Sequence, residues 1–592
     1  MAKVDSNTIS LNYARESTAG TPPSTGWRAL EPNGISAFGA QIATTAREPI
    51  SDTLQRRKGR ETDLDAPMSF SADLTYDGFN DWIEAAVFST YRNGDVTGLT
   101  PDSVDSDSFN LTLASAAADK IMLDAVSIVV TTLDGQITDS ATSITVDDAS
   151  LIRVGDQLVI GSERLNVTAI SNNTLTVTRG VGGTTAAAAA DGANVLRASF
   201  SVRASLVWAR GFASAANNGL HAAGADATTS AIEVDGILTA ESAPTGTVSL
   251  AGCRITGRGA TGTTWSWDST ERRATLTQAG VGTALHGDGG LSYGQMVHIG
   301  SVTAIGGALQ NGLPGGLTGF ARYVAHTANT LVFDRVDTAL QVSATVTMGL
   351  GRDLDLMFGD FVENVPRSSD EYQQVSHTIE QVSPDLFAIG TDGYEYATGE
   401  VVSTMTLNFP LSDKATMDMA FVGQDTERPT QNRQSGASSA VAPVLNGAYN
   451  TSADFARLRI TDVDDEGITT DFKSLTITIN PQTSAEKVLA QLGPRFINRG
   501  NLLVDVAAQA IFSSDGIPRA IRENATARFD MVIGNEDGII AIDCPAQTIS
   551  GGGREYPANQ AVLINATGES FEDETFGVSL MVSTIPVPLP TG

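Results

Sequence analysis

The sequence has few of the residues on which most catalytic and metal sites depend. Its 592 residues include only 2 Cys and 5 His. Cys253 and Cys544 form no Cys-x-x-Cys pair, so we expect two buried, small hydrophobic side chains and no zinc or redox site of that type. The five His lack the i, i+4 spacing of a metal site on a helix, which excludes that arrangement as well.

Positive charge is also scarce. The chain carries 37 Lys and Arg against 68 Asp and Glu, a formal net charge of -31. A protein that binds nucleic acid by neutralising phosphates needs the opposite balance, so this class is excluded. The first residues lack the pattern of a secretion signal, and no uninterrupted apolar run approaches the roughly 18 residues of a membrane span. We therefore expect a soluble product of a cytoplasm, without a membrane partner.

Short stretches with alternating apolar residues dominate the sequence. Val401–Phe409 places Met405, Leu407 and Phe409 on one face, and Ala415–Phe421 repeats the pattern after a turn, which predicts a hairpin. The sequence therefore predicts a mainly β fold. The best helix is expected over Gly78–Ser89, with Asp77 as its N-cap.

A repeat with an offset of 438 positions organises the chain. Asp77-Gly78-Phe79 recurs as Asp515-Gly516-Ile517, and with the same offset 68–74 falls on 506–512 and 36–41 on 474–479. The order of strand, loop of about twenty residues, strand and helix thus occurs twice. This predicts a duplicated β-rich domain.

The repeat suggests the domain boundaries. We expect a first copy over 1–91 and 366–425, interrupted by small β modules over 92–365 that include a small barrel at 135–197. A polar linker rich in Ser, Ala, Pro and Asn should cover 426–454, and the second copy 455–592.

Several segments together resemble a known family. Tyr13–Pro22, Phe70–Phe88 and Asp392–Leu407 are similar in order and pattern to the tail tube (major tail) proteins of long, non-contractile-tailed bacteriophages of the siphophage type. The insert, with Val154-Gly155-Asp156 and Arg179-Gly180, is similar to the small β modules that decorate phage tail proteins. The resemblance covers about half of the chain.

The resemblance implies a fold and an assembly. Each copy should be a β-sandwich with one short helix, and sheets of neighbouring subunits should continue into a barrel around a channel. Six such domains usually make a ring, so two per chain imply a homotrimer, with a homohexamer as the alternative. Stacked rings would form a virion tail tube that meets tape measure, tail tip and terminator proteins. Genomic DNA would pass through without specific binding.

A basic run marks the loop between the first two strands of the first copy, and in the family this loop reaches the adjacent ring. The predicted contact residues, with two from the equivalent loop of the second copy, are Arg56, Arg57, Lys58, Arg60, Arg495 and Arg499. A solvated loop is the alternative.

The acidic balance suits a channel for DNA. A lumen without Lys and Arg would not hold phosphates, so part of the negative charge is expected there. The alternative is that acidity only keeps an abundant protein in solution.

Three motifs that resemble enzyme or ligand sites lack the required context. Gly290–Gly294 matches a nucleophile elbow near His286, but a strand is expected over 295–299 where that motif needs a helix. Gly257–Gly262 and Asp462–Gly467 are predicted to be turns, since no helix follows the first and Lys473 replaces the glutamate that a calcium loop needs. No catalytic, cofactor or metal residue is predicted.

A second function remains open from the sequence. Small β modules rich in Gly, Thr and Ser, in which Trp265 and Trp267 are expected to be exposed, also suit a cell-surface adhesin or an array of carbohydrate-binding modules. A hydrolase of the cell envelope, with Ser292 as nucleophile, is a more distant alternative.

Overall fold

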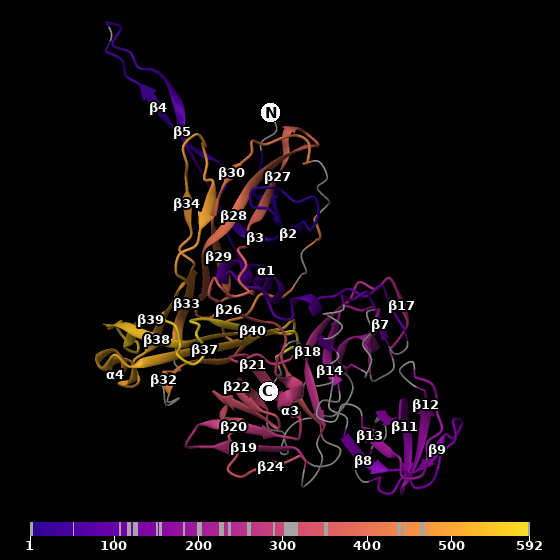
Figure 1. The fold of residues 1–592 in the computed structure, drawn as a ribbon. Coiled ribbons are helices and arrows are strands. Elements are labelled where there is room, and N and C mark those ends of the chain that lie inside the picture. The colour runs from indigo at the N-terminus through magenta and orange to yellow at the C-terminus, as the bar shows by residue number, and fades with distance from the viewer. Residues whose placement is uncertain are drawn as a thin grey trace. The chain divides into compact units, whose positions relative to one another are not determined.

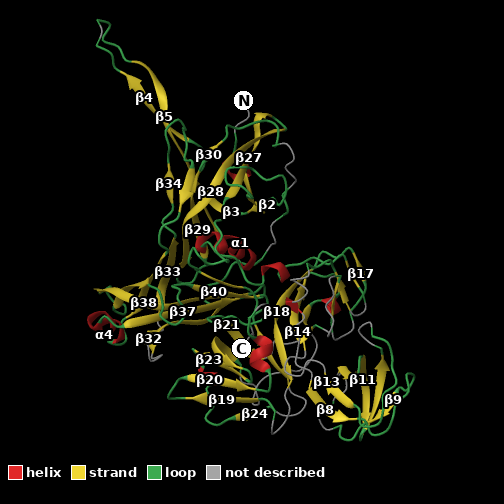
Figure 2. Cartoon of the chain, in the orientation of Figure 1, coloured by secondary structure: helices red, strands yellow, loops and turns green. Residues whose placement is uncertain are grey.

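The computed structural model describes residues 4–589 except 51, 106–107, 115–119, 122–127, 150–151, 153–156, 181–183, 198–203, 224–229, 235–237, 257–261, 288–289, 301–317, 349–352, 435–439, 443–445, 462–466 and 470–471. The mainly β fold is confirmed, and helices are few and short (Figure 2). Two of the predicted turns, at 257–262 and 462–467, and the motif Val154-Gly155-Asp156 lie wholly or largely outside the described residues.

The chain divides into two compact units. The first, which we call the wall unit, consists of residues 1–90 and 362–581, and the second, the insert unit, of residues 91–361 and 582–592. Each unit is described by itself. The wall unit contains both copies of the predicted repeat.

In the first copy, a long bent strand joins two sheets. The first half of β28 pairs with β27, and its second half pairs with β29, which continues through β5 to β3. β1 extends the other sheet from the far side of β27. The bounds are β1 Ser10–Arg15, β2 Arg28–Leu30, β3 Pro32–Ala37, β4 Gln41–Arg47, β5 Arg57–Asp73, β26 Phe361–Glu363, β27 His377–Ala388, β28 Thr391–Phe409, β29 Thr416–Gly423 and β30 Asp425–Thr426 (Figure 1).

The second copy repeats this pairing order. β38 pairs first with β37 and then with β39, which continues through β36 to β33, while β31 lies beyond β37. The bounds are β31 Phe455–Thr461, β32 Gly467–Thr469, β33 Phe472–Asn480, β34 Ser484–Glu486, β35 Phe496–Asn498, β36 Leu503–Ile511, β37 Thr526–Gly534, β38 Ile539–Glu555 and β39 Leu563–Ser570. The last strand, β40 Met581–Ile585, begins at the last residue of the wall unit, and its other residues belong to the insert unit. The same strand order therefore occurs twice in one unit.

The alternation in the sequence does place apolar side chains in the core. Met405, Leu407 and Phe409 of β28 are each at most 3% exposed, and Met417 and Met419 of β29 lie opposite them. Burial of such side chains contributes about 1.5–3 kcal/mol each. The predicted hairpin is confirmed, and a bulge between Val402 and Thr404 marks the bend of β28.

Each copy carries one short helix, α1 at Tyr76–Val87 and α4 at Gly516–Glu523. The predicted cap of the first helix is wrong by two residues, because Thr75, not Asp77, is the N-cap and accepts a hydrogen bond from the Gly78 amide. Asp77 lies in the first turn, where its charge favours the positive helix end. The predicted apolar stripe of α1 is buried.

The described residues of the insert unit form three sheets. One is a six-stranded sheet in the order β8-β13-β10-β11-β12-β9 that encloses its own apolar core, and the others have ten and four strands. The bounds are β6 Ser103–Val104, β7 Ser108–Asn110, β8 Ile128–Thr132, β9 Ser143–Thr145, β10 Gln157–Ile160, β11 Glu163–Ser171, β12 Thr174–Arg179, β13 Asn194–Arg197, β14 Ala204–Arg210, β15 Gly219–Ala222, β16 Ala231–Glu233, β17 Glu241–Ser242, β18 Thr247–Thr256, β19 Thr264–Asp268, β20 Arg273–Thr277, α3 Val281–Leu285, β21 Met296–Gly300, β22 Gly319–Thr327, β23 Thr330–Asp334, β24 Val346–Thr347 and β25 Asp353–Met357.

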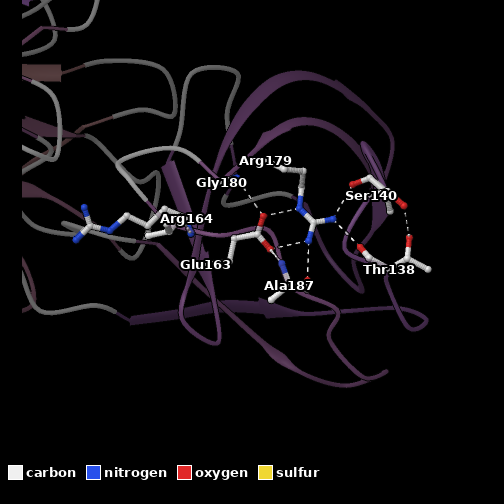
Figure 3. A network of polar contacts seen from close by, with 9 residues as sticks. Thr138, Ser140, Glu163, Arg164, Arg179, Gly180 and Ala187 are labelled. Carbon is white, nitrogen blue, oxygen red and sulfur yellow. Dashed lines mark hydrogen bonds and ion pairs between the residues drawn. The ribbon is translucent and has the colours of Figure 1, made fainter.

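A buried ion pair ties the loops of the six-stranded module together (Figure 3). Arg179 donates two hydrogen bonds to the Glu163 carboxylate, both 2.6 Å long, and others to the carbonyls of Thr138, Ala141 and Ala187. Glu163 also accepts from the backbone amides of Gly180 and Ala187. Because all guanidinium N–H groups have acceptors, this is a structural staple of the module.

Candidate assembly interface

The wall unit joins its two copies edge to edge. The outer edge of β28 pairs with β33, from Met405 opposite Ile479 to Phe409 opposite Leu475. One antiparallel sheet thus runs through eight strands in the order β3-β5-β29-β28-β33-β36-β39-β38. Sequence patterns predicted each copy's strands but not this junction.

This sheet ends in two segments that have a registered partner on one side only among the described strands. β3 pairs with β5. At the other end, residues 551–555 of β38 pair with β39, and four of these five residues are exposed. Unpaired N–H and C=O groups along such edges are ready to pair with another chain. Because β3 corresponds to β33 and β38 to β28, the two edges match the two sides of the internal junction.

One face of the sheet is apolar and buried, and the other is polar. Strand partners directly opposite one another share a face, which gives the row Ser71, Asp418, Thr406, Thr478, Asp505 and Glu569 across six strands. This acidic row contains three carboxylates and no Lys or Arg. Burial, followed by the nearby charge of Glu569, raises the pKa of Asp505.

The basic run lies on an exposed arm. β4 pairs with the outer half of β5, with Arg47 opposite Arg57, so the expected loop is a projecting β-hairpin (Figure 1). Arg57, Lys58 and Arg60 belong to β5 itself, and all are exposed. Arg56 precedes β5 and forms an ion pair with Glu48, with 2.7 Å between Nε and Oε1. The four residues are therefore gathered near the end of one arm.

The second copy has a shorter hairpin, β34–β35, in the place of this arm. Arg495 directly precedes its return strand, is exposed, and donates its backbone N–H to the Glu486 carbonyl. Lys487 reaches across to the first copy and binds Asp63 and Asp65 at 2.6 and 2.7 Å. Hydrogen bonding to Lys487 lowers the pKa of Asp63. These ion pairs connect the base of the arm to the second copy.

Arg499 lies apart from the other predicted contact residues. Its guanidinium carbon is 4.9 Å from the centre of the Phe88 ring and 5.5 Å from that of Tyr372, a cation–π arrangement. It also lines a cavity of about 620 Å³ together with Arg367 and Glu572. Arg499 therefore contacts the first copy of its own wall unit, which its position in a loop did not reveal.

The motif around Ser292 has no elbow geometry. The helix α3 precedes it and the strand β21 follows, the reverse of the required order. Ser292 is 7% exposed and its amide donates to Gln295, while the His286 ring stacks on His326 and Nδ1 contacts the Tyr323 hydroxyl. This arrangement supplies no activated nucleophile.

Other candidate residues are accounted for by packing. Cys253 and Cys544 are both buried, as predicted. Trp265, expected to be exposed, is 0% exposed and donates its indole N–H to the Leu340 carbonyl, because it fills the core of the ten-stranded sheet; Trp267 packs against the same core. Trp265 therefore has no free face for a sugar, whereas Trp267 is only partly buried. Within the described ranges, no group of three or more His, Cys, Asp or Glu is placed to hold a metal, and no helix is long and apolar enough to cross a membrane.

Part of the chain matches a known protein family. Residues 327–567 match the model of the phage tail tube protein family. The predicted resemblance to tail tube proteins is confirmed. The match spans the end of the insert unit, β27 to β30 of the first copy, the β28–β33 junction and most of the second copy. A comparison with curated proteins finds no significant match. The family supports a structural, virion-associated tail protein that assembles with itself and with other tail proteins, and it suggests a non-enzymatic role.

Proposed function

We propose that copies of this chain polymerise into the hollow tail tube of a siphophage-type bacteriophage. The observation that carries the proposal is the β28–β33 junction, which joins two tail-tube-type domains within one chain. If β38 of one chain pairs with β3 of the next chain in the way that β28 pairs with β33, the contact between chains is heterologous and repeats around a closed ring. Three chains supply six domains, which favours a trimeric, pseudo-hexameric ring over a hexamer of chains.

The ring also removes the exposed edges. Each free strand edge becomes paired, and the sheet closes on itself as a barrel. The acidic row would then run around the lumen, where it repels the phosphates of passing DNA. The two copies are the first and second tail tube domains, linked by residues 426–454, and the insert unit decorates the tube.

The arm supplies a contact for ring stacking. Its exposed Arg56, Arg57, Lys58 and Arg60 suit an acidic surface on the adjacent ring of a protein with net charge -31. Arg495 would take part from the second copy, whereas Arg499 would act through its packing on Phe88. The tape measure protein inside the tube, and tip and terminator proteins at its ends, would be the other partners.

Internal pairing predicts which residues meet between chains. Asn408 faces Thr476 at the internal junction. The repeat offset of 438 relates the strands next to this junction to the strands next to the two free edges. The strand pairings at those edges then give Glu555 of β38 and Ala37 of β3 as the corresponding positions. The double variant Ala37→Cys with Glu555→Cys should therefore cross-link between chains under a short thiol-specific reagent.

The denaturing gel after saturating cross-linking tests both the contact and its closure. A ladder that ends at three covalently joined chains supports the trimer, and one that ends at six contradicts it. Either single variant is the matched control and should give dimers at most. Assembled rings in which the double variant stays monomeric on the gel would refute the β38–β3 contact.

A further inference from the structure

The bend of β28 contains a buried carboxyl group. Glu400 lies where β28 changes partner: Glu400 is opposite His377 of β27, and the next residue, Val401, is opposite Val422 of β29. Glu400 is 0% exposed, and neither carboxyl oxygen has a hydrogen-bond partner in the part of the chain that the structure describes. An ionised carboxylate in such a place is costly, because nothing replaces its hydration.

The neighbouring Glu16 has the opposite environment. Its carboxylate accepts hydrogen bonds from the hydroxyls of Ser376 and Thr378 and from the backbone amides of Gly20 and Gly399. Four hydrogen-bond donors thus surround the Glu16 carboxylate and favour its negative charge. That charge further disfavours ionisation of Glu400.

Among the described residues, no cation forms a hydrogen bond with the Glu400 carboxyl group, and Arg15 of β1, which lies opposite His377, pairs with Glu84. The cross-strand neighbour on β27 is His377, whose pKa burial lowers to about 3, so that this ring is neutral. The neighbours on β29 and β5 are Gly423 and Ala66, which have no ionisable side chain. A Cβ at Gly423 would lie 2.1 Å from Glu400 Oε1, so this glycine makes the room for the carboxyl group.

The second copy shows what the corner accepts. There Gln547 lies where β38 changes partner, opposite Ala527 of β37 and Ser570 of β39. Gln547 is also 0% exposed, and a Cβ at Gly568 would lie 2.4 Å from its Oε1. The two copies thus place a Glu and a Gln, side chains of the same length, in matching corners with a glycine beside each. The amide has the shape of a carboxyl group and, like its protonated form, carries no charge.

We propose that Glu400 is folded into the wall as an uncharged carboxylic acid and makes the bend of β28 a proton-sensitive joint. When the proton leaves, the buried charge loosens this corner, and the half of β28 that pairs with β33 loses its support. The joint lies within a single chain, so its response to pH does not depend on the assembly of several chains.

The sign of the pH dependence follows from linkage. Burial, and then the charge of Glu16, raise the pKa of Glu400 well above its ordinary value. A carboxyl group whose pKa is raised by folding stabilises fully below the unfolded pKa, about 4.3, and this stability is lost as pH rises through the folded pKa. Between the two values the folding equilibrium falls by about tenfold per pH unit for this one proton.

The test compares pH profiles of the full chain. The thermal stability of the wild type should fall from pH 5 to pH 9 relative to that of Glu400→Gln. This variant carries the glutamine side chain that the second copy has at the matching position. Gln547→Glu is the matched control, and it should add the same alkaline loss in the second copy. Parallel profiles of wild type and Glu400→Gln would overturn the proposal, as would failure of Glu400→Gln to fold.

Infrared difference spectroscopy gives a readout that does not depend on stability. The folded wild type at pH 7 should retain the C=O band of a protonated carboxylic acid, and Glu400→Gln should lack it. A wild type without that band at pH 7 would equally refute the proton-sensitive joint.

Discussion

Removal of one charge from the acidic row gives the sharpest test of its repulsion. Asp505 and Glu569 lie directly opposite each other on β36 and β39. Like charges in that position destabilise a sheet by roughly 0.2–1 kcal/mol. Replacing Glu569 by Gln keeps the side chain's size and removes one charge, so the variant should be more stable at pH 7.

Only part of the upward shift in the pKa of Asp505 should disappear in this variant. Burial is the larger cause of its raised pKa and remains in the variant, while the contribution of Glu569 is lost. A raised carboxyl pKa means that stability is present below the unfolded value, about 3.9, and is lost as pH rises through the folded value. The gain from Glu569→Gln should therefore be full at pH 7 and vanish near pH 3, below the unfolded pKa of Asp505, where the Asp505 carboxyl group is protonated.

Hydrogen exchange measures this locally, which suits a chain of several domains. Amides of β36 and β39 should exchange about 1.4- to 5-fold more slowly in Glu569→Gln at pH 7, the factor that corresponds to roughly 0.2–1 kcal/mol. Glu536→Gln, an equal change at an exposed position outside the row, is the control. Unchanged or faster exchange in β36 and β39 would refute the reasoning that the row carries repulsive charge.

Three further changes test other parts of the structure. Arg179→Met should leave Glu163 buried without its cation, cost about 3–5 kcal/mol and unfold the six-stranded module, which limited proteolysis would detect. Because its partners lower the pKa of Glu163, that module should also lose stability as pH falls through the folded pKa, and circular dichroism at acid pH checks it. Arg57→Glu should leave soluble subunits but impair tube growth in electron microscopy, and normal growth would contradict the role of the arm. Tubes with Asp418→Lys and Asp505→Lys should retain duplex DNA in sedimentation at low salt and release it at high salt, whereas the matching Asn changes should retain none.

The sequence predicts strands far better than strand partners. The alternation over Val401–Phe409 reports which face is buried, and burial of one face fixes the register of a strand. The outer edge of the same strand leaves no such trace, because backbone groups of any sequence can pair there. The β28–β33 junction, on which the assembly proposal depends, therefore emerged only from the structure.

The surroundings of a side chain that contacts residues far away in the sequence could not be predicted either. Arg499 looked like a free cation in a loop, yet Phe88 and Tyr372, from other parts of the chain, hold it. Glu400 looked like one acidic residue among many, and its burial depends on Gly423 in the next strand. The arm was expected to be a loop, and its hairpin was missed because both of its strands are exposed and show no apolar period.

The number of chains in one ring tests the central claim most directly. Electron microscopy of concentrated protein, with symmetry counted on end-on views of single rings, would give it. We predict three chains and six similar wall domains around an open channel. Six chains in a ring would contradict the internal junction as the model for the contact between chains, and dispersed particles under all conditions would contradict the tube itself.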